Sequence, residues 1–261
     1  MTTRQDKMEA FWRLLDVMDR LRAECPWDRE QTNESLRANT IEEVHELSDA
    51  ILSGASEEIK KELGDVLLHI VFYSKIGEEQ GAYDVASVCH ALCDKLIYRH
   101  PHIYGSAEAD DSDSVVRNWE QLKQKEKGGN KTALSGVPSS LPSMIKAYRI
   151  QDKARGLGFD WEERREVWAK VREELAELEE ALEAKDLDEA EAEWGDLFFG
   201  LINAARLYKI NPDNALERTN QKFIRRFGYV EASAQAMGRE LRDMTLAEMD
   251  TLWDEAKAKG L

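Results

Sequence analysis

The sequence predicts an all-α protein built from two related halves. Apolar residues recur every three or four positions through most of the 261 residues, whereas strand-like alternation is scarce. Only five prolines interrupt this pattern. Four acidic residues also occur twice at one internal spacing, which indicates a repeated structural unit.

Each helix is predicted from its own periodicity. In the first, residues 9–22, the side chains of Phe11, Leu14 and Met18 share one stripe. The same pattern predicts further helices over 36–52, 57–77, 84–98, 115–127, 143–155, 162–184, 188–208, 212–236 and 245–259. A segment rich in Gly, Ser and Pro separates the halves. We therefore expect domains at 1–127 and 144–261, joined by a linker at 128–143.

Composition excludes several classes of protein. The net charge of −16 disfavours binding to nucleic acid, and no run of about 18 apolar residues is present for a membrane span. The first residues lack the apolar block of a signal peptide, so we expect a cytoplasmic protein. Three cysteines without zinc-type spacing fit a reducing compartment, and we expect Cys89 and Cys93 to be buried in a helix.

The repeated acids form two pairs in each half, Glu-x-x-Glu followed by Glu-x-x-Asp. All four are shifted by the same 131 positions, as 174−43 shows for the first of them. The eight acids are Glu43, Glu46, Glu62 and Asp65 in the first half and Glu174, Glu177, Glu193 and Asp196 in the second. Residues three apart share one face of a helix, so each pair presents two carboxylates together.

Short turns near residues 53–56 and 185–188 connect the two acidic helices of each half, which predicts antiparallel hairpins. Each hairpin then gathers four carboxylates. Two such charges about 4 Å apart repel by about 4 kcal/mol at an effective dielectric of about 20. A cation must lie among them, and hard oxygen ligands favour Mg²⁺ or Mn²⁺.

Other residues repeat beside the acids. Gly64 and Gly195 stand between the Glu and the Asp of each second pair, and we expect another helix or a ligand to approach them closely. Two cations for phosphate, repeated at a different offset of 127, and then a tryptophan for a base follow the acids in each half. These are Lys95, Arg99 and Trp119 in the first half and Lys222, Arg226 and Trp253 in the second.

Two simpler interpretations compete with this one. A solvated surface helix can be rich in Glu, but it does not explain the duplicated spacing. A di-iron site would use Glu-x-x-His, which Glu42 and His45 provide. The second half has Ala176 where the first has His45, which argues against two irons.

Together these motifs resemble the MazG nucleoside triphosphate pyrophosphohydrolases. The resemblance rests on Glu-Glu-x-x-Glu followed by Glu-x-x-Asp, starting at Glu42 and again at Glu173, and it covers nearly the whole chain. Cys-Pro-Trp-Asp at 25–28, Arg-His-Pro-His at 99–102 and Gly-Phe-Asp-Trp at 158–161 agree with it. It implies all-α four-helix units that form a homodimer. It also implies Mg²⁺-dependent conversion of nucleoside triphosphates, ATP included, to monophosphate and pyrophosphate, with broad specificity that clears excess or aberrant nucleotides.

The resemblance also implies residue roles, mainly in the second half. Glu174, Glu177, Glu193 and Asp196 would bind the metal, and Glu173 would position the water and contact the substrate beside Glu174. Lys170, Lys222 and Arg226 would hold phosphates, and Trp253 would contact the nucleotide. The first half would use its matching residues in a lesser role.

The halves differ at one position before the acids. Lys170 stands one turn before Glu174, whereas Asn39 stands before Glu43. We therefore expect the second half to be the main catalyst. The alternative is a regulatory scaffold that binds nucleotide and metal without catalysis.

Overall fold

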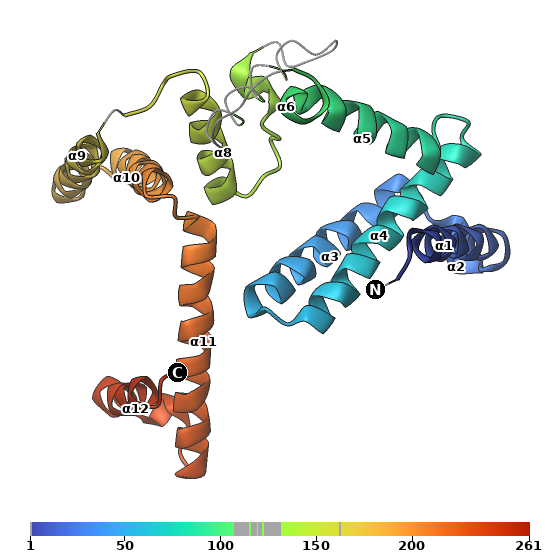
Figure 1. Cartoon of the computed structure of the whole chain (residues 1–261). Helices are drawn as coiled ribbons and strands as arrows, with labels where there is room; N and C mark the ends of the chain where they lie inside the picture. The colour runs from blue at the N-terminus through green and yellow to red at the C-terminus, as the bar shows by residue number, and fades with distance from the viewer. Residues whose placement is uncertain (1, 107–114, 116–118, 120–121, 123–131, 162) are drawn as a thin grey trace. The chain divides into compact units, whose positions relative to one another are not determined.

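A computed structural model of the chain describes residues 2–106, 115, 119, 122, 132–161 and 163–261 (Figure 1). These residues form helices and connecting segments with no strand, so the predicted all-α fold class is confirmed for them. The chain divides into two compact units, Met1–Ala109 and Asp110–Leu261. None of the described helices is both long and apolar enough to span a bilayer.

The first unit is a helical hairpin flanked by further helices. Its helices are α1 (Arg4–Glu24), α2 (Pro26–Glu30), α3 (Asn33–Ser53), α4 (Ser56–Glu79), α5 (Val85–Arg99) and α6 (Pro101–Tyr104). Side chains of Thr3, Thr32 and Asp84 cap α1, α3 and α5 by accepting backbone hydrogen bonds. α3 and α4 pack along their length, and α1 packs against α4.

The core of the first unit lies where α1 meets this hairpin. It contains Met18 of α1, Leu36 of α3 and three residues of α4, namely Val71, Phe72 and Ile76. Because α1 fills this side of α4 with apolar side chains, the acidic side chains are placed elsewhere on the hairpin.

The second unit repeats the hairpin and extends it. Its elements are the 3₁₀ helix η1 (Ala133–Gly136), α8 (Ser143–Arg155), α9 (Arg164–Ala184), α10 (Leu187–Leu207), α11 (Pro212–Ala236), the 3₁₀ helix η2 (Leu241–Asp243) and α12 (Leu246–Ala258). α9 and α10 form the hairpin, and α8 packs against α10. In Figure 1, α11 leads away from the hairpin and α12 packs against its far half.

Two apolar clusters stabilise the second unit. Val171 and Leu178 of α9 pack with Leu197 of α10 inside the hairpin. Val230 of α11 packs with Leu252 of α12 in the other cluster. The unit thus has one core within its hairpin and one at the contact between α11 and α12.

The two hairpins turn at the same repeat position. Gly54 follows α3 with a φ of 72°, and Lys185 follows α9 with a φ of 60°. These residues are 131 positions apart, the offset of the acids. Both occupy the left-handed region that commonly ends a helix, so the repeat extends to the backbone of the turn.

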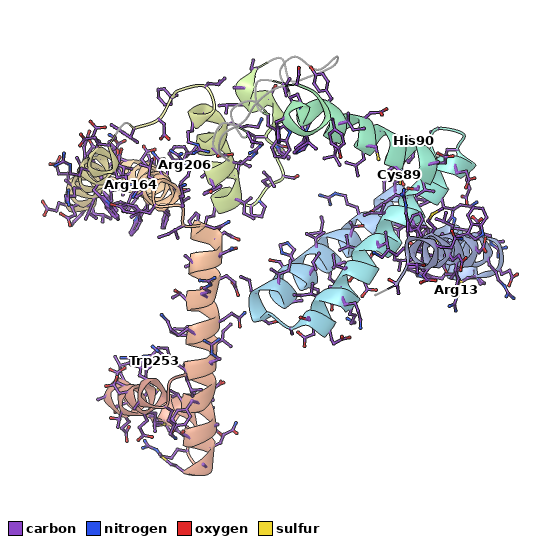
Figure 2. The ribbon with its side chains drawn as sticks, viewed as in Figure 1. Arg13, Cys89, His90, Arg164, Arg206 and Trp253 are labelled. Atoms are coloured by element: carbon purple, nitrogen blue, oxygen red, sulfur yellow. The ribbon has the colours of Figure 1, made fainter. Side chains whose placement is uncertain are left out.

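The predicted helices agree with the structure to within a few residues, except for the short α2 and α6, which were not predicted. The predicted helix 115–127 and the start of the predicted linker 128–143 lie largely outside the described residues. The domain boundaries therefore stay predictions. The expected burial of Cys89 and Cys93 is wrong: both are exposed, because α5 buries none of its residues in the single chain (Figure 2).

Candidate functional site

The hairpin of the second unit brings acids of both helices together. Glu174 and Glu177 of α9 and Glu193 of α10 each place one carboxylate oxygen within 4.8 Å of the others. The antiparallel turn at Lys185 makes this possible, because it folds the middle of α10 back beside the middle of α9. We call these three residues the second acidic cluster. It matches the predicted carboxylate nest in three of its four members.

Charge repulsion and burial act on this cluster. Loss of solvent, followed by the negative charges of its neighbours, raises the pKa of Glu177 and of Glu193. Glu174 is buried, with 6% of its surface exposed. The buried Oε2 atom of Glu193 has no hydrogen-bond partner among the described residues. One buried carboxylate, two neighbouring carboxylates with raised pKa and a buried oxygen without a partner together favour a bound cation.

Lys170 partly neutralises the second cluster. Its Nζ lies 2.8 Å from Oε1 of Glu174 and 3.0 Å from Oε1 of Glu173. These two carboxylates raise the pKa of Lys170. Glu173 and Glu174 are neighbours in sequence, yet both reach one ammonium group, because Lys170 precedes them by three and four positions. Glu173 itself is exposed.

The first unit has an equivalent cluster formed by Glu43 of α3 with Glu62 and Asp65 of α4. One oxygen from each lies within 4.8 Å of the others. Burial, then the charges of Asp65, Glu46, Glu62 and Glu42, raises the pKa of Glu43. Glu62 is buried, and its Oε2 atom has no hydrogen-bond partner in the described part of the chain. We call these three residues the first acidic cluster.

A lysine also contacts the first cluster, but from the other helix. Nζ of Lys61 on α4 lies 2.9 Å from Oε1 of Glu62 and 4.0 Å from Oδ2 of Asp65. Asn39 in the place of Lys170 therefore does not leave the first cluster without a lysine. Comparison of Asn39 with Lys170 missed it, since Lys61 has Ala192 as its counterpart.

Glu46 and Asp196 fall outside the two close groups. Each is exposed, yet each lies near enough to raise the pKa of a cluster member, Glu46 that of Glu43 and Asp196 that of Glu193. The predicted fourth acid of each nest therefore lies at its edge.

Gly64 and Gly195 have empty space beside them. A Cβ atom built on either would meet no heavy atom of the described residues within 4 Å. The expected close approach of another helix is therefore not made by the part of the chain that the structure describes. A substrate or another chain remains the reason we predict for these glycines.

The structure joins two of the predicted nucleotide contacts but places them away from the second cluster. Arg226 of α11 lies over the ring of Trp253 of α12, with its guanidinium carbon 5.7 Å from the ring centre. Its Nε donates a 2.7 Å hydrogen bond to the backbone oxygen of Leu261. Lys222 is exposed one turn earlier on α11. Figures 1 and 2 show Trp253 on α12, beyond the α9–α10 hairpin.

The matching residues of the first half include two cations on α5. Lys95 is exposed on α5, and Arg99 is the last residue of that helix. Trp119 is half-buried, but most of its sequence neighbours lie outside the described residues. Their predicted roles stay predictions.

The sequence reasoning missed a polar group beside the first cluster. Oγ1 of Thr40 lies 3.0 Å from Nδ1 of His69 and 2.6 Å from the hydroxyl of Tyr73, and it donates to the backbone oxygen of Leu36. His69 is buried, and burial lowers its pKa. The counterparts in the second unit are Val171, Gly200 and Ala204, none of which can form these bonds. All three positions differ between the two halves, and this joint difference is the sequence signal that could have identified the group.

The donor atoms argue against the di-iron interpretation. In the described residues, the close groups that could hold a metal contain carboxylates alone. His45 is exposed on α3 and belongs to neither group. An all-oxygen donor set fits Mg²⁺ or Mn²⁺.

Comparison with known proteins agrees with this geometry. The sequence profile of the MazG nucleotide pyrophosphohydrolase domain matches residues 31–104 and 163–230, which contain both acidic clusters. The two matches correspond to the two hairpins and the helix after each.

Relatives match nearly the full chain. It is 39% identical over 250 residues to the nucleoside triphosphate pyrophosphohydrolase/pyrophosphatase MazG of Thermotoga maritima, covering 95% of each chain. It is 38% identical over 261 residues to the nucleoside triphosphate pyrophosphohydrolase of Escherichia coli K12, covering 97% of this chain and 99% of the relative. The uncharacterized protein YabN of Bacillus subtilis is 43% identical over 235 residues, which are 89% of this chain and 48% of that protein. The chain belongs to the MazG nucleotide pyrophosphohydrolase family.

Proposed function

We propose that the protein is a Mg²⁺-dependent nucleoside triphosphate pyrophosphohydrolase, which releases monophosphate and pyrophosphate from a broad range of nucleotides. The observation that carries this proposal is the pair of acidic clusters, each with three carboxylate oxygens within 4.8 Å. The names of the relatives from Thermotoga maritima and Escherichia coli support the activity.

The cluster residues fit a divalent cation. Glu193 and Glu62 each keep a buried oxygen without a partner among the described residues. Loss of solvent and then repulsion from neighbouring carboxylates raise the pKa of Glu193, and a cation would offset both. Glu174, Glu177 and Glu193, with Asp196 at the edge, would hold the ion in the second unit. When bound, Mg²⁺ would supply positive charge for the phosphate oxygens and for the attacking water; Mn²⁺ has similar ligand preferences.

The chain's own residues would bind the substrate and move the proton. Cleavage of the α–β linkage requires a water that attacks the α-phosphorus and a pyrophosphate that departs with its oxygen. Glu173 is exposed beside the cluster and could orient this water and accept its proton. Lys170, released from Glu173 and Glu174, could pair with a phosphate.

We place the main activity in the second unit. Only there, among the described residues, does one lysine contact both the buried Glu174 and the exposed Glu173. In the first unit, Lys61 contacts Glu62 and Asp65, and Glu42 has no lysine one turn before it. The first unit would bind metal, support assembly or hydrolyse more slowly.

We also propose a homodimer. α5 buries no residue in the single chain, and apolar side chains of α11 such as Phe223 and Ile224 are exposed. Lys222, Arg226 and Trp253 lie away from the second cluster of their own chain. A partner chain packed on these helices would cover the apolar faces and could bring such cations to the acids.

The test is to incubate the protein with Mg²⁺ and a panel of ribo- and deoxyribonucleoside triphosphates, normal and modified, and to identify the products by mass. Monophosphate with pyrophosphate is the expected result. Diphosphate with phosphate would contradict the proposed bond, and absence of any product across the panel would favour the regulatory scaffold.

A further inference from the structure

The helices α9 and α10 approach each other closely at Gly200, beside the second cluster. A Cβ atom added to Gly200 would lie 3.3 Å from Cγ2 and 4.0 Å from Cα of the buried Val171. The first distance is too short for a relaxed contact, so one methyl group would force a movement of a few tenths of an ångström. Gly is unfavourable inside a helix relative to Ala, and this contact is what the absence of a side chain permits here.

Val171 and Gly200 stand next to the acids on their helices. Val171 precedes Glu174 by three residues, and Gly200 follows Glu193 by seven. These spacings place each of them on the stripe of its helix that carries the acids. The separation of the two backbones at this contact therefore sets how far Glu174 lies from Glu193.

Short side chains also lie on the other side of the second cluster, toward the turn of the hairpin. Ala181 of α9 and Ala190 of α10 are buried in the same apolar cluster as Val171. Ala181 follows Glu177 by four residues, and Ala190 precedes Glu193 by three. The acids thus lie between two places where small residues let the helices pack closely.

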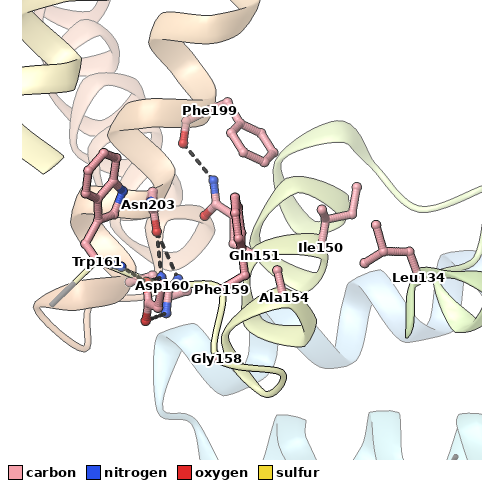
Figure 3. A pocket seen from close by; sticks show the side chains of 11 residues that line it. Leu134, Ile150, Gln151, Ala154, Gly158, Phe159, Asp160, Trp161, Phe199 and Asn203 are labelled. Atoms are coloured by element: carbon pink, nitrogen blue, oxygen red, sulfur yellow. Dashed lines mark hydrogen bonds and ion pairs between the residues drawn. The ribbon is translucent and has the colours of Figure 1, made fainter. Parts of the chain in front are cut away.

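On its other side, α10 is held by α8 and by the segment before α9. Nε2 of Gln151 on α8 donates a 2.8 Å hydrogen bond to the backbone oxygen of Phe199 (Figure 3). Nη1 of Arg206 donates to Oδ2 of Asp160 at 3.0 Å. A cavity of about 500 Å³, lined in part by the amides of Gln151 and Asn203, lies between α8 and α10, and these bonds hold α10 beside it. A methyl group added at the close contact should therefore displace α9 and the acids that it carries.

The first hairpin has a larger residue at the matching position. His69 stands in place of Gly200, and its Nδ1 lies 3.0 Å from Oγ1 of Thr40, the counterpart of Val171. The two clusters also differ in their third acid, which comes from α4 in the first unit and from α9 in the second. Among the described residues, the close contact and its arrangement of acids therefore belong to the second unit.

We propose that Gly200 is a positioning residue, which sets the spacing of the second cluster for Mg²⁺ rather than for a larger cation. The inference rests on the proposed function of the second unit, in which this cluster binds the metal. Distances from Mg²⁺ to oxygen are about 2.0–2.1 Å, whereas Ca²⁺ accepts about 2.3–2.6 Å and a more flexible geometry. The difference is of the same size as the movement that a methyl group at Gly200 requires. A wider spacing should therefore weaken the binding of Mg²⁺ and spare that of Ca²⁺.

Metal binding by the full chain without nucleotide tests this inference. Glu62→Gln removes an acid of the first cluster, and in this background Mg²⁺ or Ca²⁺ displaces bound Mn²⁺, which is followed by electron paramagnetic resonance. We expect Gly200→Ala to raise the dissociation constant of Mg²⁺ about fivefold, while that of Ca²⁺ stays within about twofold. Gly228→Ala is the matched control in the interior of α11, where an added Cβ atom meets no heavy atom of the described residues within 4 Å. It should change neither constant.

Two further variants separate spacing from general damage. Val171→Ala in the Gly200→Ala chain removes Cγ2 and leaves a contact of 4.0 Å, so it should restore the Mg²⁺ constant to within about twofold. Gly200→Ser adds the same Cβ atom and should repeat the selective loss.

Three results would overturn the inference. They are equal weakening of both ions, no change in either, and failure of Val171→Ala to restore Mg²⁺ binding in a protein of unchanged helix content. If the variants behave as expected but the unsubstituted protein hydrolyses no triphosphate, the proposed function alone fails.

Discussion

The two acidic clusters share two matching glutamates, Glu43 with Glu174 and Glu62 with Glu193, but take their lysine from opposite helices of the hairpin. Lys61 of α4 contacts the first cluster, and its counterpart Ala192 has no charge; Lys170 of α9 contacts the second, and its counterpart is Asn39. Each cluster thus keeps one cation within reach although the sequence around it has changed. The acids require a positive charge close to them, and a lysine on either helix can provide it.

The helix that supplies the lysine decides which acids it contacts. Lys170 contacts one buried and one exposed carboxylate, Glu174 and Glu173. Lys61 contacts Glu62 and, more weakly, Asp65. The second cluster therefore has its lysine beside the acid that we propose to position water, and the first does not.

The interiors of the two hairpins also differ. The first places Thr40, His69 and Tyr73 in one hydrogen-bonded group. In the second, a Cβ atom added at Gly200 would lie 3.3 Å from Cγ2 of Val171, so the helices pack closely there. One unit is held by polar bonds at the place where the other uses close apolar packing.

The largest expected difference between the units is in turnover. Glu174→Gln should reduce kcat/KM by about 100-fold or more, because it removes a buried acid from the second cluster. The matched Glu43→Gln should change the same quantity less than about threefold. Rates of pyrophosphate release measure both, and equal losses would refute the assignment of the main activity to the second unit.

Thr40→Val, which introduces the residue found at the matching position Val171, should lower the free energy of unfolding by about 2 kcal/mol, because it leaves the buried His69 and the hydroxyl of Tyr73 without their shared partner. Urea unfolding measures the free energy. The reverse change, Val171→Thr, should cost less, because a helical Thr can donate to the carbonyl four residues earlier. A larger cost for Val171→Thr would contradict this account.

Removal of the lysine beside the acids should lower kcat/KM about tenfold in the second unit and leave it nearly unchanged in the first. Lys170→Ala is expected to lower kcat/KM, whereas Lys61→Ala should leave it within about twofold. Both lysines are substantially exposed, so neither change should alter the unfolding free energy by more than about 1 kcal/mol. If Lys61→Ala proves as damaging as Lys170→Ala, the first unit contributes directly to catalysis.

The hairpin turns allow a smaller test. Lys185 adopts a left-handed conformation that costs about 1 kcal/mol for a residue with a Cβ atom, so Lys185→Gly should stabilise the second unit by up to about that amount. The opposite change, Gly54→Lys, should destabilise the first unit by a similar amount. Thermal unfolding of the two variants would show shifts of opposite sign, and a shared sign would exclude the backbone explanation.

The smallest expected effect is the pH dependence of stability without metal. The folded state raises the pKa of Glu43, Glu177 and Glu193, so it binds more protons than the unfolded state and loses stability as pH rises above about 4.5. His69, whose pKa is lowered, acts oppositely and loses stability on acidification below about 6.5. With a chelator, the three glutamates contribute more stability at about pH 4.5 than at pH 7.5.

Magnesium at pH 7.5 should remove most of this carboxylate contribution. Glu193→Gln and Glu43→Gln should each reduce the response to pH, which separates the two units. A melting temperature that is insensitive to Mg²⁺ in the unsubstituted protein would contradict a cation site at either cluster.

The sequence by itself determined the helices, the hairpins and the acids that meet in them. These features depend on short spacings, namely three or four residues along one helix and one tight turn. Such spacings fix the local geometry without contacts between distant residues. The offset of 131 then identified Glu43, Glu62 and Asp65 as matches of Glu174, Glu193 and Asp196.

Only the tertiary structure decided which lysine meets each cluster, where Arg226 and Trp253 lie, and that Gly195 has empty space beside it. It also decided the cavity, which depends on contacts between distant residues, such as Gln151 with Phe199 and Asp160 with Arg206. Such contacts have no periodic signal, because they depend on how helices cross rather than on spacing within one helix. The two halves share the pattern of the hairpin. α1 packs against the first hairpin and completes a filled core, whereas α8 packs against the second and leaves an amide-lined cavity.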